Sequence, residues 1–317
     1  MALSPRFAFL SIVSLASVLA LAAEPALAQS QGRQAAPRTA AAPPAAARPK
    51  PPIELSPDEQ QRIDQLLDAW EKESNKVESF KCKFTRWDYD RTFGPKDNDF
   101  LMAERKGEIK FRAPDKGTFK ETSMKVYEPP KDDKSHGNYV TSKDGMEHWV
   151  CDGNAIYQFK PAQKVLEISE LPEAMRGKAI TEGPLPFIFG AKANTLRQRY
   201  WIHEVTPREE AAEFIWLEAF PKFAQQAAEF KKVRIILTRA ELLPFAMEVY
   251  LPNGQDRTAY AFEKPIVNEL FGGIKDFLPP MTPFGWRKVV NPANPPAAQA
   301  VDNPLKQATR PKGNLLR

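Results

Sequence analysis

The three histidines are the first candidates for metal binding or acid–base chemistry: His136, His148 and His203. None of them lies in an H-x-x-H or H-E-x-x-H pattern, and no cysteine pair has the spacing of zinc ligands, which argues against a zinc site. His148 alternates with Met146 and Val150 in an expected strand, which favours a structural role. The sequence therefore predicts no metal and no cofactor.

Nucleophilic and carboxylate chemistry has equally little support. The chain contains no G-x-S-x-G motif and no glycine-rich phosphate loop. Acidic pairs such as Asp97/Asp99 lie in polar turns, and a glycosidase needs two carboxylates at a fixed separation across a cleft. An enzyme that acts on envelope polymers would need polar residues that converge in a cleft, and the sequence does not show them. The sequence therefore predicts a protein without catalytic activity.

Cys82 and Cys151 are the two cysteines of the chain. In an oxidising compartment they could form a disulfide. The alternative is two buried apolar thiols, because small apolar side chains of this kind pack well in a core. Their separation in sequence does not decide between the two.

The more informative residues are large and apolar, and they lie on strands of which both faces look apolar. A sheet that closes only partly into a barrel leaves an inner face suited to acyl chains, each buried methylene contributing about 0.8 kcal/mol. The alternative is that the aromatic residues fill an ordinary sandwich core. The candidate lining residues are Phe80, Phe84, Ile109, Phe111, Trp149, Tyr157, Phe159, Phe187, Ile188 and Phe189.

One helix is expected before these strands. Ser56 can cap it, Pro57 suits its first position and Glu59 completes a capping box. The residues that follow at helical spacing and need a partner surface are Ile63, Leu66, Leu67 and Trp70. We expect this helix to cover a sheet, and over a concave sheet it would also act as a lid.

About ten antiparallel strands are expected after the helix, because apolar residues then recur at a period of two. They fall at residues 77–89, 107–112, 118–126, 146–151, 155–159, 164–171, 200–205, 214–220, 232–238, 245–251 and 257–262. Residues 183–190 are apolar but are interrupted by prolines and bracketed by glycines, so we expect a gate over the mouth of the sheet.

The ends of the chain differ from this central part. Residues 1–28 have the charged start, apolar run and small-residue site of a secretory signal peptide, with a retained membrane anchor as the alternative. Residues 29–52 form a Pro/Ala-rich linker and residues 290–317 a basic tail, both expected to be disordered. The remaining residues, 53–289, are expected to form one β domain. We expect the protein to be periplasmic or secreted, with no transmembrane segment after cleavage of the signal peptide.

The formal net charge of +5 does not belong to this domain. The linker carries four positive charges and the tail a net three, which leaves −2 for residues 53–289. A nucleic-acid-binding protein would concentrate positive charge on its folded face, so that class is excluded. The tail could contact anionic lipid or cell-wall polymer, or it could simply keep the chain in solution.

Several segments together resemble LolA-like proteins, the superfamily of periplasmic lipoprotein carriers and receptors. Residues 152–161 read DGNAIYQFKP, similar to the family's D-G strand. The segments 77–84 (VESFKCKF) and 107–114 (GEIKFRAP) resemble its first two strands, and the order of all segments matches over residues 63–264. The chain is most similar to a secreted LolA-like group of planctomycete bacteria, for which the resemblance implies no established activity.

The resemblance implies a mainly β, α+β fold: a half-open antiparallel barrel with covering helices and a cavity for lipid or lipoprotein acyl chains. One departure concerns the carriers' arginine directly before the proline of the second strand. Ala113 occupies that position, and Arg112 stands one residue earlier, on the opposite strand face. The resemblance therefore does not carry over the carriers' way of holding the lid. The second hypothesis is an envelope protein-interaction or sensor module with a filled core and a protein partner, which the linker and tail would suit.

Overall fold

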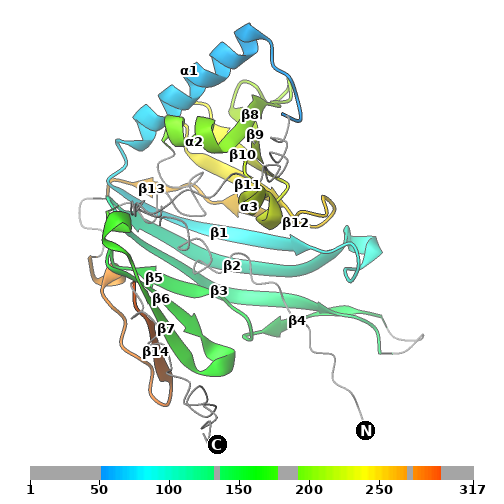
Figure 1. Cartoon of the computed structure of the whole chain (residues 1–317). Helices are drawn as coiled ribbons and strands as arrows, with labels where there is room; N and C mark the ends of the chain where they lie inside the picture. The colour runs from blue at the N-terminus through cyan, green and yellow to red at the C-terminus, as the bar shows by residue number, and fades with distance from the viewer. Residues whose placement is uncertain (1–50, 132–135, 178–191, 270–273, 294–317) are drawn as a thin grey trace, which may run out of the picture.

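The computed structural model describes residues 51–131, 136–177, 192–269 and 274–293. The predicted signal peptide, most of the predicted linker and tail, and the predicted gate with Phe187, Ile188 and Phe189 lie outside the described residues. The described chain forms one strongly twisted sheet with a few helices, and its elements are seen in Figure 1.

The sheet has fourteen strands, and its edges stay apart, so it is an open antiparallel sheet. Its path runs β14-β7-β6-β5-β3-β2-β1-β12-β11-β10-β9-β8, with β13 paired to β1 and β4 to β3. The strands are β1 (Ser79–Tyr89), β2 (Leu101–Arg112), β3 (Lys116–Glu128), β4 (Asn138–Ser142), β5 (His148–Cys151), β6 (Ala155–Lys160), β7 (Val165–Glu170), β8 (Tyr200–Glu204), β9 (Phe214–Pro221), β10 (Lys232–Thr238), β11 (Pro244–Tyr250), β12 (Arg257–Phe262), β13 (Ile266–Val267) and β14 (Arg287–Asn291).

The helices are short except for the first. The α-helices are α1 (Pro57–Ser74), α2 (Ala193–Arg199) and α3 (Ala224–Glu229), and the 3-10 turns are η2 (Lys96–Asn98), η3 (Pro161–Gln163), η4 (Glu173–Met175) and η5 (Ile274–Phe277). The predicted fold class, mainly β with an open antiparallel sheet and covering helices, is confirmed.

The strand count exceeds the predicted ten for local reasons. The strand β14 is short, pairs in parallel with β7 and begins only after a proline-rich segment, so alternation does not reveal it. It extends to Asn291, two residues into the segment expected as a tail. The strands β4 and β13 are likewise short and carry no clear alternation.

The start of α1 follows from its sequence. The Ser56 hydroxyl accepts a hydrogen bond from Glu59 N at 3.3 Å, and the Glu59 carboxylate accepts one from Ser56 N at 2.9 Å. This capping box satisfies two of the free N–H groups at the start of the helix. The helix buries Ile63, Leu67 and Trp70 against the sheet.

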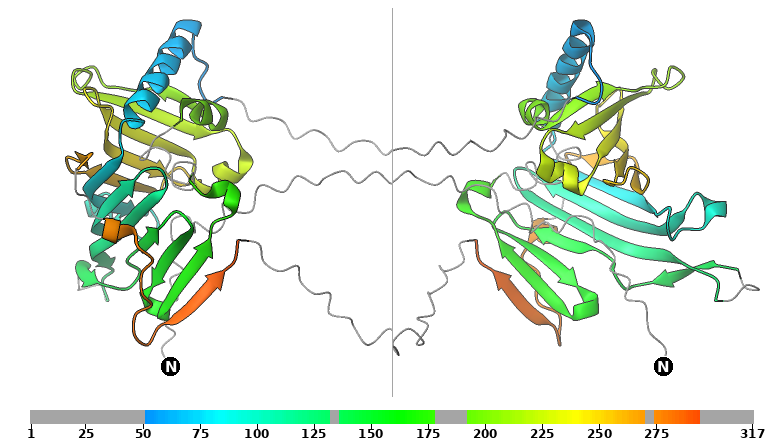
Figure 2. Two further views of the ribbon diagram at one scale, coloured as in Figure 1. Left: turned by 90° about the vertical axis from the view of Figure 1, so that its left-hand side faces the viewer. Right: turned by 45° about the vertical axis from the view of Figure 1, so that its right-hand side comes forward.

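The face of the sheet that α1 and α2 cover is called here the inner face. On β1 it carries Phe80, Cys82 and Phe84, while Lys81 and Lys83 point to the other side. Figures 1 and 2 show the two helices over the β8–β11 half of the sheet, with the other half curving away toward β14. One large apolar cluster joins the two halves across this face.

Candidate ligand-binding face

Five of the ten predicted lining residues meet on the inner face. Phe80 pairs with Phe111 across β1 and β2, and Phe84 and Ile109 lie further along the same two strands. These four side chains are buried, and Trp149 packs against them from β5. The alternation of β1 and β2 was therefore sufficient to predict that Phe80, Phe84, Ile109 and Phe111 share a face, because side chains two residues apart point to the same side of a sheet.

A ladder of aromatic rings crosses the strands at this face. Phe119 of β3 stacks on Phe84 at 4.8 Å between ring centroids and on Trp149 at 6.0 Å. Gly107, opposite Phe84, makes this possible, since a Cβ atom there would lie 2.5 Å from Phe84 Cζ. Phe119 was not among the predicted lining residues, because a register shift opposite Gly107 interrupts the alternation of β3.

Tyr157 and Phe159 do not join this group. Tyr157 pairs with Val150 and shares its face of the sheet, whereas Cys151 and its partner Ile156 face the inner side. The two aromatic residues pack instead against a separate cluster of Ala155, Leu166 and Ile168. A side-chain period of two places residues 156 and 157 on opposite faces, so a strand that is apolar on both faces divides its residues between two clusters.

The D-G motif of this strand has a structural role in the turn before it. Asp152 Oδ1 accepts hydrogen bonds from Asn154 N and Ala155 N, both at 2.8 Å. The Tyr157 hydroxyl donates to Asp152 Oδ2 at 3.0 Å. Gly153 has a φ of 94°, in the left-handed region that favours glycine. Burial, together with this carboxylate, raises the pKa of Tyr157 to about 12.

Polar contacts hold the two covering helices to each other. Arg197 of α2 reaches Asp64 Oδ1 of α1 at 2.8 Å and Asp68 Oδ1 at 2.6 Å. Glu71 of α1 accepts a hydrogen bond from Ala193 N at 3.0 Å, at the start of α2. These contacts lie at the surface, and the apolar stripe of α1 lies beneath them. The helix α1 is therefore held by polar contacts to α2 and by the burial of its apolar stripe.

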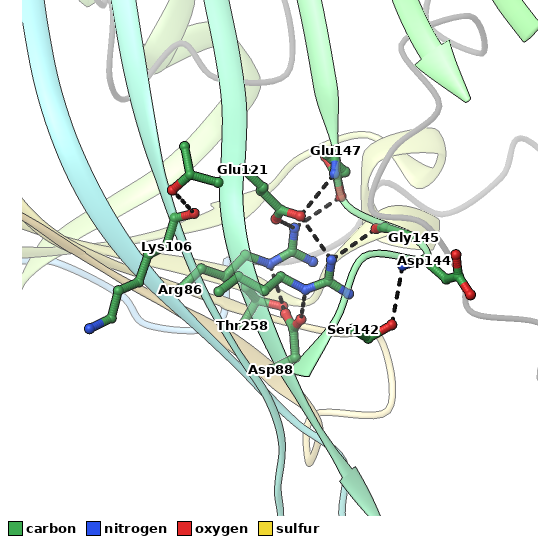
Figure 3. A network of polar contacts seen from close by, with 11 residues as sticks. Arg86, Asp88, Lys106, Glu121, Ser142, Asp144, Gly145, Glu147 and Thr258 are labelled. Atoms are coloured by element: carbon green, nitrogen blue, oxygen red, sulfur yellow. Dashed lines mark hydrogen bonds and ion pairs between the residues drawn. The ribbon is translucent and has the colours of Figure 1, made fainter. Parts of the chain in front are cut away.

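The inner face ends in a buried group of charges that the sequence analysis did not foresee (Figure 3). Arg86 of β1 contacts Asp88 at 2.8 Å, Glu147 at 2.9 Å and Glu121 at 3.4 Å. Arg105 of β2 contacts Asp88 and Glu121, each at 2.9 Å. The name charge network is used here for these five residues.

Backbone groups and a threonine complete the charge network. Arg105 also donates to Gly145 O at 3.0 Å, and Glu147 N donates to Glu121 Oε2 at 2.8 Å. The Thr258 hydroxyl donates to Asp88 Oδ1 at 3.1 Å. These bonds fix the turn between β4 and β5. Two cations face three carboxylates, so the charge network has a formal net charge of −1, and its members are hydrogen-bonded to one another.

Burial dominates the electrostatics here. It raises the pKa of Glu121 above its ordinary value, and the attraction of Arg105 and Arg86 offsets only part of this effect. A signal for the charge network was present in the sequence. Arg86 and Asp88 continue the inward series of Phe80 and Phe84 along β1, and charges at inward positions of a strand must find partners.

The two cysteines are free thiols, so the predicted alternative of two buried thiols is confirmed. Cys82 lies on β1 and Cys151 on β5, with β2 and β3 between them. Three strand spacings amount to about 14 Å, too far for a disulfide. Burial raises the pKa of Cys82 to about 12 and that of Cys151 to about 11.

Within the described ranges, no group of three or more His, Cys, Asp or Glu side chains is arranged to hold a metal ion. His148 stacks on Phe159 with ring centroids 4.2 Å apart, and burial lowers its pKa to about 4. His203 lies 3.6 Å from Glu218 on the other face of the sheet. None of the described helices is long and apolar enough to cross a membrane.

Comparison with known proteins gives only structural neighbours. No protein-family model matches the chain, and no curated protein matches it either. It is similar to an uncharacterized conserved protein from Thermus thermophilus, with 10% identity and a TM-score of 0.38, over 73% of this chain and 99% of that chain. It is also similar to a LolA superfamily protein from Nitrosomonas europaea, with 9% identity and a TM-score of 0.31, over 67% and 97%.

A third neighbour is MucB of Pseudomonas aeruginosa in its complex with MucA, with 12% identity and a TM-score of 0.33, over 68% of this chain and 60% of that chain. The LolA superfamily, which the motifs pointed to, is thus among the structural neighbours. At these identities and scores the likeness concerns the fold, and nothing about a ligand follows from it.

Proposed function

We propose that this chain is an exported envelope protein without catalytic activity. It binds lipid or lipoprotein acyl chains on the inner face and acts as their carrier. The observation that carries the proposal is the grouping of Phe80, Phe84, Ile109, Phe111 and Trp149 on the inner face. The buried residues of α1 belong to the same apolar cluster, and polar contacts join α1 to α2. Export rests on the signal-peptide pattern of residues 1–28, and the linker and tail would flank the folded domain.

The energies of the cover and of an acyl ligand are comparable. Lifting α1 exposes Ile63, Leu67 and Trp70, which costs roughly 5–9 kcal/mol at about 1.5–3 kcal/mol for each side chain. An acyl chain of about 16 carbons contributes about 12 kcal/mol at ~0.8 kcal/mol for each buried methylene. A ligand of this class can therefore take the place of the apolar stripe of α1.

The first test is native mass spectrometry of the mature protein purified from the cell envelope, followed by organic extraction of whatever accompanies it. Bound lipid or lipoprotein supports the proposal and gives its class. A protein that is empty, and that also fails to bind a fluorescent fatty acid, contradicts the proposal.

A variant of the clasp tests the mechanism. Arg197→Ala removes the contacts to Asp64 and Asp68 and is expected to speed uptake of the fluorescent fatty acid about tenfold, which corresponds to losing about 1.4 kcal/mol of charged hydrogen bonds. Arg208→Ala is the matched control, because Arg208 is exposed in the turn after β8. Equal uptake rates in the two variants would contradict a covering role for α1 and α2.

A second candidate function is favoured by how completely the inner face is filled. Phe80, Phe84, Ile109 and Phe111 expose only 4%, 1%, 1% and 6% of their surface, so other protein atoms surround them. A protein-interaction or sensor module with a filled core would have this property. It predicts that neither the wild type nor Arg197→Ala binds the fatty acid, whereas a carrier binds it in both forms.

A further inference from the structure

The segment between η5 and β14 presents large apolar side chains to solvent. Leu278, Met281 and Phe284 are 55%, 91% and 106% exposed, and the last two are the most exposed large apolar residues of the described chain. Residues 278–286 are called here the apolar loop. Three prolines at positions 279, 280 and 283 restrict its backbone, so these side chains cannot easily fold back onto the domain.

Both ends of the apolar loop are fixed to the domain. Phe277 is buried at its start, beside Asp276, which pairs with Lys110 of β2 at 2.9 Å. At its other end, Trp286 makes an edge-to-face contact with Phe159 at 6.3 Å between ring centroids. The exposed side chains are therefore held on a supported loop.

The surroundings of the apolar loop are basic. Arg287 N donates to Lys164 O at 2.8 Å, so the loop ends beside the turn of the β6–β7 hairpin, as Figure 2 shows for the orange segment. The side chains of Lys164, Arg287 and Lys288 are exposed there. The carboxylate of Glu167, on the neighbouring strand, is paired with Lys160.

Exposed apolar side chains flanked by cations suit a membrane surface, where the apolar groups enter the interface and the cations meet anionic headgroups. We propose that the apolar loop docks this protein onto the surface of a membrane that contains anionic lipid. The occupant is a lipid surface, and this docking does not depend on whether the inner face binds acyl chains. It would bring the domain to a bilayer without a membrane-spanning segment.

The test is co-sedimentation of the mature protein with vesicles of phosphatidylcholine alone and with vesicles of an equal mixture of phosphatidylcholine and phosphatidylglycerol. The wild type is expected to bind the mixed vesicles more tightly, with added salt weakening the binding. The double variant Met281→Ser/Phe284→Ser is expected to bind about a hundredfold more weakly, at roughly tenfold for each apolar side chain removed. Arg287→Gln/Lys288→Gln is expected to lose the preference for the mixed vesicles by roughly tenfold.

The control variant is Phe223→Ser, an exposed phenylalanine at the start of α3, which is expected to bind as the wild type does. The variants of the apolar loop change exposed side chains, so their thermal unfolding should match the wild type. Binding of the monomeric fluorescent fatty acid should also be unchanged, which separates this proposal from the proposed function. Failure of the wild type to bind either vesicle, or equal binding by the apolar double variant, would overturn it.

Discussion

Replacing Glu121 by alanine is the most informative single perturbation of the inner face. The Glu121 side chain is fully buried and accepts from Arg86, Arg105 and Glu147 N. Its removal leaves the two buried arginines with Asp88 and Glu147 as their carboxylate partners and deprives Glu147 N of its hydrogen-bond acceptor. The expected loss of stability therefore comes from an incompletely paired buried charge and from lost hydrogen bonds.

The magnitude follows from these contacts. Removing one partner from a buried ion pair costs about 3–5 kcal/mol, so Glu121→Ala is expected to lower the free energy of unfolding by about that amount. Glu121→Gln keeps an acceptor for the arginines and for Glu147 N. Because burial raises the pKa of Glu121, neutralising it removes a costly charge, and a smaller loss of about 1–2 kcal/mol is expected.

The assay is urea unfolding followed by circular dichroism, with Glu209→Ala as the control. Glu209 is exposed in the turn after β8, and its removal should change the unfolding free energy by less than about 0.5 kcal/mol. A loss below about 1 kcal/mol for Glu121→Ala would refute the view that the charge network depends on each of its members. The same conclusion would follow if the glutamine and alanine variants were equally destabilised.

Three further predictions concern other buried groups. Because burial lowers the pKa of His148 to about 4, the stability it contributes is complete above pH 6.5 and is lost as pH falls toward 4; His148→Gln should flatten that part of the unfolding curve measured against pH. Burial raises the pKa values of Cys82 and Cys151, so neither thiol should react with a thiol reagent until the protein is unfolded, and rapid reaction in the native state would contradict their placement. Asp152→Ala should lower the free energy of unfolding by about 2–3 kcal/mol through its lost acceptors, while Asp144→Ala, at an exposed position, should not.

The sequence alone predicted the features that depend only on residues close together in the chain. The capping box at Ser56 and Glu59 was predicted from residue types at fixed spacing, and the structure has both of its hydrogen bonds. The inward series of β1 followed from strict alternation in the same way. The order of the strands was not predictable by such rules, because β1 pairs with β12 and β7 with β14 across most of the chain length.

The candidate site was predicted less completely because a period of two cannot say which face of a strand is inner. Tyr157 and Phe159 are aromatic like Phe80, and only the pairing of β5 with β6 assigns them to the other face. Phe119 was missed because a bulge breaks the series on β3. The charge network was missed because its partners lie on four separate segments and become neighbours only in the folded sheet.

The charge network also limits how a ligand could lie on the inner face. The apolar series of β1 from Phe80 to Phe84 is about 13 Å long, at about 3.3 Å per residue. Beyond it stand Arg86 and Asp88, whose hydrogen bonds are satisfied and whose burial against methylenes alone would be costly. An acyl chain would therefore gain no contact by advancing past Phe84. Under the proposed carrier function, the chain enters from the side of α1 and α2, which Arg197 joins. The Arg197 variant is therefore expected to change uptake, whereas variants of the charge network are expected to change stability.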